Sequence, residues 1–331
     1  MIASFVSEQN RGLPDDWEES RPSLRPKVWS RVTIETMDLD AQLKGTQVLD
    51  TPLVPVGEHL YASVVYDMPT SLASVSTEQL ATWGVSLYEA LEAARDNLRA
   101  CPSSWLRAGD SLARAVVGDS YESARLLLID SIRELGLGGT PIAVAPCRDS
   151  LLVAGEDDPD AIRTLLTLVR EDVQELARPL SPLPLILRDD EWVDWEPPVG
   201  HPARPLFDEL AVHYYADAYG TQRELLEALQ EARAEPAGFV ATYFGLKSTD
   251  TGLVTSACAW GRGVDSLLPR TERIDFVDEE GVIASGTWSH VQQVAGELLE
   301  PDGRYFPPRY RAREFPSDEQ LDRIGRLPRG E

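Results

Sequence analysis

The sequence predicts an α+β protein with two lobes, in which mixed or antiparallel sheets pack against helices. The chain has 331 residues, and one domain usually takes about 100–200 residues. Its hydrophobic content of 43% is normal for a globular protein with real cores. Strand-like and helical stretches follow each other without strict strand–helix–strand alternation, which favours α+β.

The first lobe is expected over residues 1–190. Alternating apolar and polar residues predict a strand around Val28–Thr36, and the β-branched and aromatic run His59–Asp67 predicts a second. Ser76 and Ser86 each precede a polar N3 residue and so predict helix starts, the first helix ending at Gly84.

The rest of this lobe carries equally local signals. A third helix is predicted over residues 120–135, followed by a hairpin of Ile142–Cys147 and Ser150–Gly155. Asp158 before Pro159 is typical of a helix start, and an apolar stripe continues the helix to about residue 177. The proline-rich, acidic residues 189–206 are expected to join the lobes.

The second lobe is expected over residues 207–331, with an arginine- and aromatic-rich tail from Pro301. Its predicted helices are 206–220, 221–236 and 288–300, and its predicted strands are 239–247, 253–260, 273–278 and 281–286.

Three blocks resemble a known bacterial family. They are LYASVVYDMPTSLASVSTEQLATWGVSLYEALEAARDNL, DSYESARLLLI and IAVAPCRDSLLVAGEDDPDAI, within segments 61–98 and 120–169, and LLPRTERIDFVD adds a later block. The chain resembles the uncharacterised YtpQ-like family over roughly half its length. The resemblance implies a fold for the first lobe but no activity and no site residue.

The charge excludes several partners. The chain has 55 acidic against 31 basic residues, a net charge of −24, which repels nucleic acid and anionic membranes and suits a basic protein. The start, MIASFVSEQNRGLP, does not have the pattern of a signal peptide, and no apolar run reaches about 20 residues. With Cys101, Cys147 and Cys258 read as reduced thiols, a cytoplasmic protein is expected.

The turn residues Arg148 and Asp149 are the first binding candidates. They lie between two apolar strands and would meet a ligand or partner at a sheet edge. The alternative is turn chemistry, in which Asp149 bonds backbone N–H groups and Arg148 pairs with a neighbouring carboxylate.

Two tryptophans and three arginines complete the binding candidates. Trp192 and Trp195 would form an aromatic protein-binding surface or simply pack the joint between lobes. Arg309, Arg311 and Arg313 alternate with aromatic residues, as in single-strand nucleic-acid binders. In so acidic a chain, we expect them to lie on its own body or on a second copy.

No cofactor or metal is predicted. The acidic run Glu156–Asp160 lacks the register of a calcium loop and is explained by helix capping. His213 and Asp217 are spaced for contact on one helix, either as an acid–base pair or as a surface hydrogen bond. No nucleophile elbow, Walker loop or dinucleotide fingerprint occurs.

The sequence therefore favours a non-enzymatic, acidic protein-binding module, of the immunity, antitoxin or accessory kind. One alternative is a scaffold subunit that self-associates through its tail. The other is an enzyme whose site is assembled from residues distant in sequence.

Overall fold

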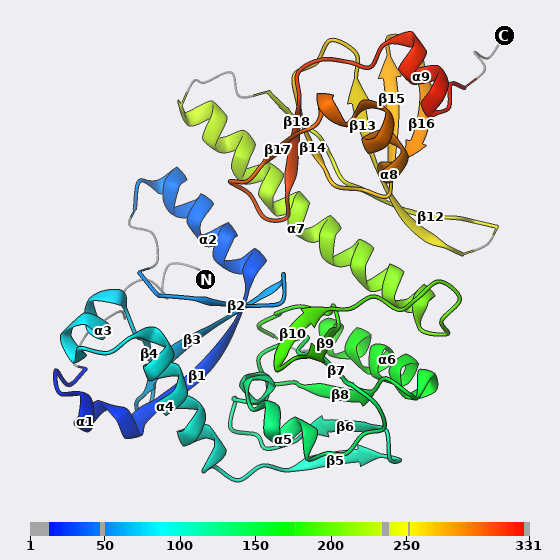
Figure 1. Ribbon diagram of the computed structural model, residues 1–331. Helices are drawn as coiled ribbons and strands as arrows, with labels where there is room; N and C mark the ends of the chain where they lie inside the picture. The colour runs from blue at the N-terminus through cyan, green and yellow to red at the C-terminus, as the bar shows by residue number, and fades with distance from the viewer. Residues whose placement is uncertain (1–12, 47–49, 176, 234–237, 251, 328–331) are drawn as a thin grey trace. The chain divides into compact units, whose positions relative to one another are not determined.

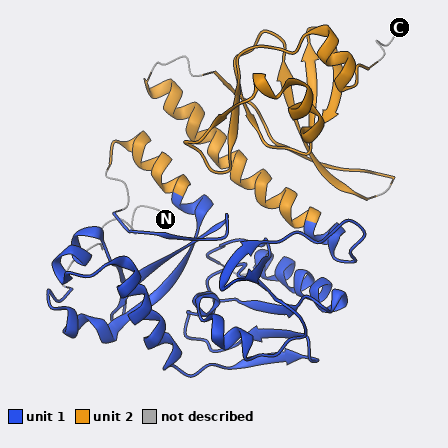
Figure 2. Ribbon diagram, viewed as in Figure 1, with its two compact units in different colours: residues 1–34, 49–207 blue, residues 35–48, 208–331 orange. Residues whose placement is uncertain are grey.

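The computed structural model describes residues 13–327 apart from 47–49, 176, 234–237 and 251, and its architecture is α+β (Figure 1). The chain divides into two compact units. Unit 1 comprises residues 1–34 and 49–207, and unit 2 comprises residues 35–48 and 208–331 (Figure 2). Two of the three boundaries along the chain fall inside helices, after residue 34 in α2 (Arg31–Lys44) and after residue 207 in α7 (Arg204–Arg233).

Unit 1 contains two antiparallel sheets. The first has the order β1-β3-β2, with β4 also paired to β3, and its strands are β1 (Leu24–Ser30), β2 (Val54–Val56), β3 (Leu60–Asp67) and β4 (Leu72–Ser74). The second has the order β10-β9-β7-β8-β6-β5, with strands β5 (Trp105–Ala108), β6 (Leu112–Ala115), β7 (Pro141–Val144), β8 (Leu152–Gly155), β9 (Leu185–Arg188) and β10 (Glu191–Asp194).

The helices of unit 1 begin where capping residues predict. Ser76 caps α3 (Thr77–Trp83), Gly84 ends it in a left-handed conformation, and Ser86 forms a full capping box at α4 (Leu87–Arg99). Asp158 accepts backbone N–H groups at the start of α6 (Pro159–Glu175). A short helix α1 (Trp17–Ser20) and a 3-10 turn (Arg21–Ser23) precede β1.

The predicted helix 120–135 is wrong. The segment forms a 3-10 turn (Ser123–Leu127) and the short helix α5 (Ile129–Arg133), separated by Leu128 at φ −95° and ψ 67°. Ser120 takes a left-handed backbone with φ 64°. The three consecutive residues 126–128 are all buried. Two short turns can bury three consecutive side chains more readily than a regular helix, which buries only one face.

The strand predicted over 28–36 is also displaced. β1 ends at Ser30, and residues 31–44 form α2. The alternation of apolar and polar residues suggested a strand, but such a local pattern is a weak signal that tertiary context overrides.

One hydrophobic core joins both sheets of unit 1. It includes Leu24, Val28 and Leu60 from the first sheet together with Val153 and Leu185 from the second. The predicted hairpin of β7 and β8 is confirmed, with Val144 paired to Leu152.

Unit 2 contains two further four-stranded sheets. One has the order β11-β14-β18-β17, with strands β11 (Phe239–Val240), β14 (Ser266–Pro269), β17 (Glu300–Asp302) and β18 (Arg309–Ala312). The other has the order β12-β13-β15-β16, with strands β12 (Phe244–Lys247), β13 (Val254–Gly261), β15 (Arg273–Asp278) and β16 (Gly281–Thr287). The shorter helical elements of unit 2 are α8 (Trp288–Ala295), a 3-10 turn (Gly296–Leu298) and α9 (Asp318–Ile324).

Two predictions for unit 2 need correction. Residues 204–233 form the single helix α7, because Gly220 is exposed and a helix tolerates such a glycine for about 1 kcal/mol. The run 239–247 is not one strand but β11 and β12, which pair in different sheets. The predicted pair β15 and β16 is confirmed.

Arg309 is a structural residue of unit 2. Its side chain has no exposed surface, and its guanidinium donates to the carbonyls of Ala241, Leu267 and Tyr219 and to Gln222 Oε1 at 2.5–3.3 Å. Burial lowers the pKa of Arg309 to about 10. The tail therefore supplies a core strand whose arginine binds the carbonyls of three other segments.

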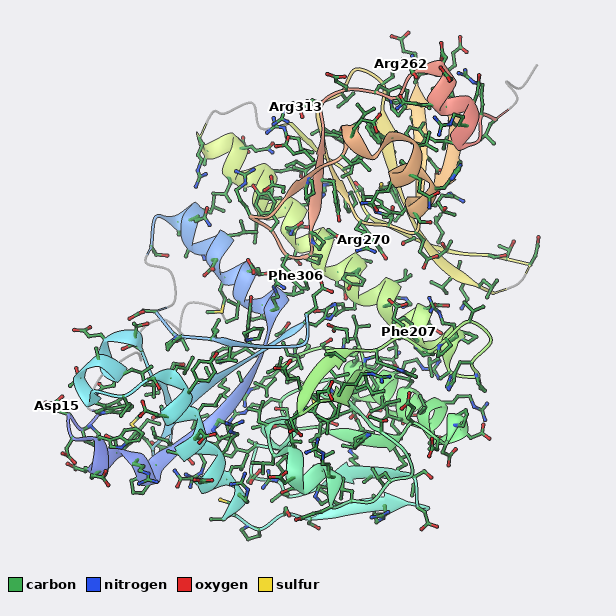
Figure 3. The ribbon with its side chains drawn as sticks, viewed as in Figure 1. Asp15, Phe207, Arg262, Arg270, Phe306 and Arg313 are labelled. Atoms are coloured by element: carbon green, nitrogen blue, oxygen red, sulfur yellow. The ribbon has the colours of Figure 1, made fainter. Side chains whose placement is uncertain are left out.

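We expect Arg309→Met to lower the free energy of unfolding by about 3 kcal/mol, because several buried acceptors lose their donor at about 1 kcal/mol or more each. Arg313→Met is the matched control, since Arg313 is exposed at the surface of unit 2 (Figure 3). It pairs with Glu300, and such surface pairs contribute about 0–1 kcal/mol. Urea denaturation measures both variants. Equal losses would contradict the structural role of Arg309.

Candidate functional site

A cavity in unit 1 holds the candidate site. Its volume is about 840 Å³, and it lies against β1, the β3–β4 loop and three loops that contain Tyr121, Arg148 and Arg178. Three basic side chains, Lys27, Arg148 and Arg178, line it together with two acidic ones. The chain is acidic overall, yet three of the five charged side chains that line this cavity are basic.

Arg148 is fixed by two residues with left-handed backbones. The Arg148 amide donates to the Arg178 carbonyl at 3.1 Å, and Arg148 Nε donates to the Ser120 carbonyl at 3.0 Å. Arg178 and Ser120 have φ values of 62° and 64°, a conformation that costs a residue other than glycine about 1–3 kcal/mol. Two strained residues thereby hold Arg148, Arg178 through the Arg148 backbone amide and Ser120 through the guanidinium.

The terminal guanidinium nitrogens of Arg148 and Arg178 make no hydrogen bond to another residue in the described part of the chain. Nε makes the one side-chain hydrogen bond of Arg148 to a described residue, and its guanidinium lies 6.0 Å from the Tyr121 ring centroid. Exposed Arg178 has no ion pair or side-chain hydrogen bond within the described part of the chain. Both guanidinium groups can therefore donate to a bound anion.

Lys27 is the third cation. It lies on β1, half-buried, with Nζ 3.4 Å from the centroid of the Trp29 ring. The Trp29 indole N–H donates to Ser63 Oγ at 2.7 Å, which fixes the ring. Burial, and then the charges of Arg148 and Arg178, lower the pKa of Lys27 to about 7. A bound anion would offset these effects and favour the protonated amine.

Tyr121 adds an unsatisfied polar group. Its side chain lines the cavity and is 9% exposed, and its hydroxyl lies near the Asp67 carboxylate without a hydrogen bond of normal geometry. Burial and the nearby Asp67 carboxylate raise the pKa of Tyr121, so the hydroxyl keeps its proton. Buried polar groups normally find a partner, and a ligand in the cavity would provide one.

The two acidic residues of the cavity differ in their partners. Both Asp119 oxygens bind buried Arg125, at 2.9 and 2.7 Å, and Asp119 also accepts the Tyr121 N–H. Burial raises the pKa of Asp119, but these hydrogen bonds outweigh it and hold the pKa below its ordinary value. Asp119 is thus neutralised locally, while Asp67 lies beside Tyr121.

Among the binding candidates predicted from the sequence, Arg148 lines this cavity and Asp149 does not. Asp149 is exposed in the turn. Trp192 is buried in β10 and donates its indole N–H to the Leu126 carbonyl at 2.8 Å. Trp195 is half-buried and packs edge-on against His201 at 5.9 Å. The two tryptophans do not share one exposed surface.

The tail arginines belong to unit 2. Arg309 is fully buried, Arg311 binds Asp265 with two hydrogen bonds, and Arg313 pairs with Glu300. They bind acidic groups and carbonyls of their own unit. On α7, His213 Nδ1 bonds the Glu209 carbonyl at 2.7 Å rather than Asp217.

Glu58, His59 and Asp194 form a separate cluster whose potential metal-ligand atoms lie within 4.8 Å of one another. His59 Nδ1 lies 2.8 Å from Asp194 Oδ1, and Asp194 Oδ2 accepts the Glu58 N–H at 2.7 Å. Both carboxylate oxygens are therefore engaged within the protein. We interpret the cluster as a buried histidine held by a carboxylate 135 residues away.

Local patterns could not reveal most of the cavity. Lys27, Tyr121 and Arg178 come from separate parts of the sequence, and only the Arg148 turn carried a local signal.

No family model matches the chain, and neither a curated protein nor a solved structure matches it. The likeness to the YtpQ-like family accordingly stays a prediction. No helix in the described part of the chain is both long and apolar enough to cross a membrane.

The pair of Asp119 and Arg125 predicts a pH dependence. Because the folded pKa of Asp119 lies below its unfolded value of about 4, its contribution to stability is complete above pH 4 and is lost as pH falls through the folded pKa. Asp119→Asn is expected to reduce the free energy of unfolding at pH 7, with a smaller difference from wild type at pH 3. Denaturant titrations at both pH values check this, and a constant difference would contradict it.

Proposed function

We propose that unit 1 binds a small organic anion, a carboxylate or a phosphate ester, in the cavity lined by Lys27, Arg148 and Arg178. The observation that carries the proposal is the convergence of these three cations on a cavity of about 840 Å³ in a chain of net charge −24. Guanidinium groups match the planar or tetrahedral oxygens of such anions with paired hydrogen bonds.

The size and lining of the cavity support a small ligand. Pockets for small molecules usually measure about 300–1,000 Å³ and combine apolar walls with a few polar groups. Here Val65, Met68 and Leu72 accompany the charged residues and the Tyr121 hydroxyl. We place this function in the cytoplasm, because all three cysteines are free thiols.

Arg178→Gln is expected to weaken the binding of inorganic phosphate about tenfold, since a hydrogen bond to a charged group contributes about 1.5–3 kcal/mol. Titration calorimetry and the rise in melting temperature with phosphate measure the effect, with chloride at equal ionic strength as reference. Arg163→Gln is the matched control, because Arg163 is exposed on α6 and pairs with Asp160. If phosphate binds the wild-type protein no better than chloride and raises its melting temperature no more, the proposal is contradicted.

We propose a protein partner as a second function, on a different observation. β12 is the edge strand of its sheet, and all four of its residues are exposed, among them Phe244 and Leu246. An exposed edge with apolar side chains is suited to adding a strand from another chain. The net charge favours a basic partner that associates in a salt-sensitive way.

A double variant, Phe244→Asp with Leu246→Asp, is expected to abolish such a complex while unit 2 stays folded. Tagged protein purified at low and then moderate salt should retain one stoichiometric basic protein, released by salt and absent with the variant. Recovery of the chain alone would count against a protein partner. Recovery of a second copy, measured by sedimentation, would favour self-association instead.

A further inference from the structure

Lys27 occupies an unusual place for a lysine in this chain. The sequence contains three lysines, Lys27, Lys44 and Lys247. Lys44 is exposed and pairs with Asp40, and Lys247 is exposed on β12. Lys27 instead lines the cavity from the middle of β1, with its amine against the Trp29 ring.

The surroundings of Lys27 favour an uncharged amine. Burial is the first cause, and the positive charges of Arg148 and Arg178 add to it, which brings the pKa of Lys27 to about 7. At neutral pH, many more of the molecules then carry a neutral, nucleophilic amine at Lys27 than at an ordinary exposed lysine, which is almost fully protonated.

Other charged and titratable groups face the same cavity. Asp67 would favour the charged amine, Asp119 is bound to Arg125, and the Tyr121 hydroxyl remains protonated. The two arginines therefore determine the local sign of charge, and the ligand anion that they bind would lie in the same cavity as the amine.

We propose that Lys27 forms an imine with a small aldehyde or ketone that carries a carboxylate or phosphate group. The inference rests on the proposed anion-binding function, since Arg148 and Arg178 would hold the anionic group while Lys27 meets the carbonyl carbon. Desolvated lysines beside another cation are used for this chemistry in general.

The step balances without another reactant. The Lys27 nitrogen lone pair forms a bond to the carbonyl carbon, and the proton lost by nitrogen passes to the oxygen. The carbon–oxygen bond then breaks, and the oxygen leaves as water with the second proton of the nitrogen, which leaves the C=N bond. The Tyr121 hydroxyl, which lies near Asp67 without a hydrogen bond of normal geometry, can donate a hydrogen bond to the carbonyl oxygen as negative charge develops there.

The test uses pyridoxal 5′-phosphate, an aldehyde with a phosphate group, on the full chain. Borohydride reduces any imine to a stable secondary amine, and peptide mass mapping assigns each modified amine. We expect Lys27 to be modified at least tenfold faster than Lys44 or Lys247 at pH 7. Inorganic phosphate should slow the reaction at Lys27 alone, and the rate at Lys27 should reach half its maximum at a lower pH than the rate at Lys44 or Lys247.

Two variants separate this inference from the anion-binding proposal. Lys27→Arg has no primary amine at this position, so the reduced adduct should be lost there, while phosphate binding is measured separately on the wild-type protein, where phosphate forms no adduct. Lys44→Arg is the matched control and should leave the adduct at Lys27 unchanged. Modification of all three lysines at similar rates would overturn the imine, even if phosphate stabilises the protein. If the wild-type protein does not bind phosphate, the proposed anion site itself is overturned.

Discussion

The hydrogen bonds around Arg148 are the interaction on which the candidate site depends. Its amide and Nε bind the carbonyls of Arg178 and Ser120, and its own carbonyl accepts the Ser123 N–H. Beside it, Cys147 pairs with Pro179 as an isolated bridge. One residue thus connects three loops, and two strained backbone conformations persist because the surrounding contacts determine them.

The charge of the whole chain and the charge of the cavity have opposite signs. A net charge of −24 repels an anion at long range, but salt screens this repulsion over about 8 Å at physiological ionic strength. Affinity must therefore come from direct contacts inside the cavity, where three cations converge. This arrangement suits a small ligand that enters the cavity better than a long polyanion that would cross the acidic surface.

Local signals predicted some parts of the structure well and others poorly. Capping residues such as Ser86 located helix starts, because a cap acts within one turn. The predicted helix 120–135 failed because burial from several sides, rather than one apolar stripe, shapes that segment. In the candidate site, the turn pointed to Arg148. The role of Lys27 could not be predicted, since Arg148 and Arg178 lie more than a hundred residues away in sequence.

The central claim is that a small anion binds between these cations. A crystal structure of the full chain grown in phosphate tests it most directly. We expect a phosphate in the cavity of unit 1, with its oxygens within hydrogen-bond distance of the Arg148 and Arg178 guanidinium groups. Ordered water alone in this cavity, with phosphate bound at other arginines, would contradict it.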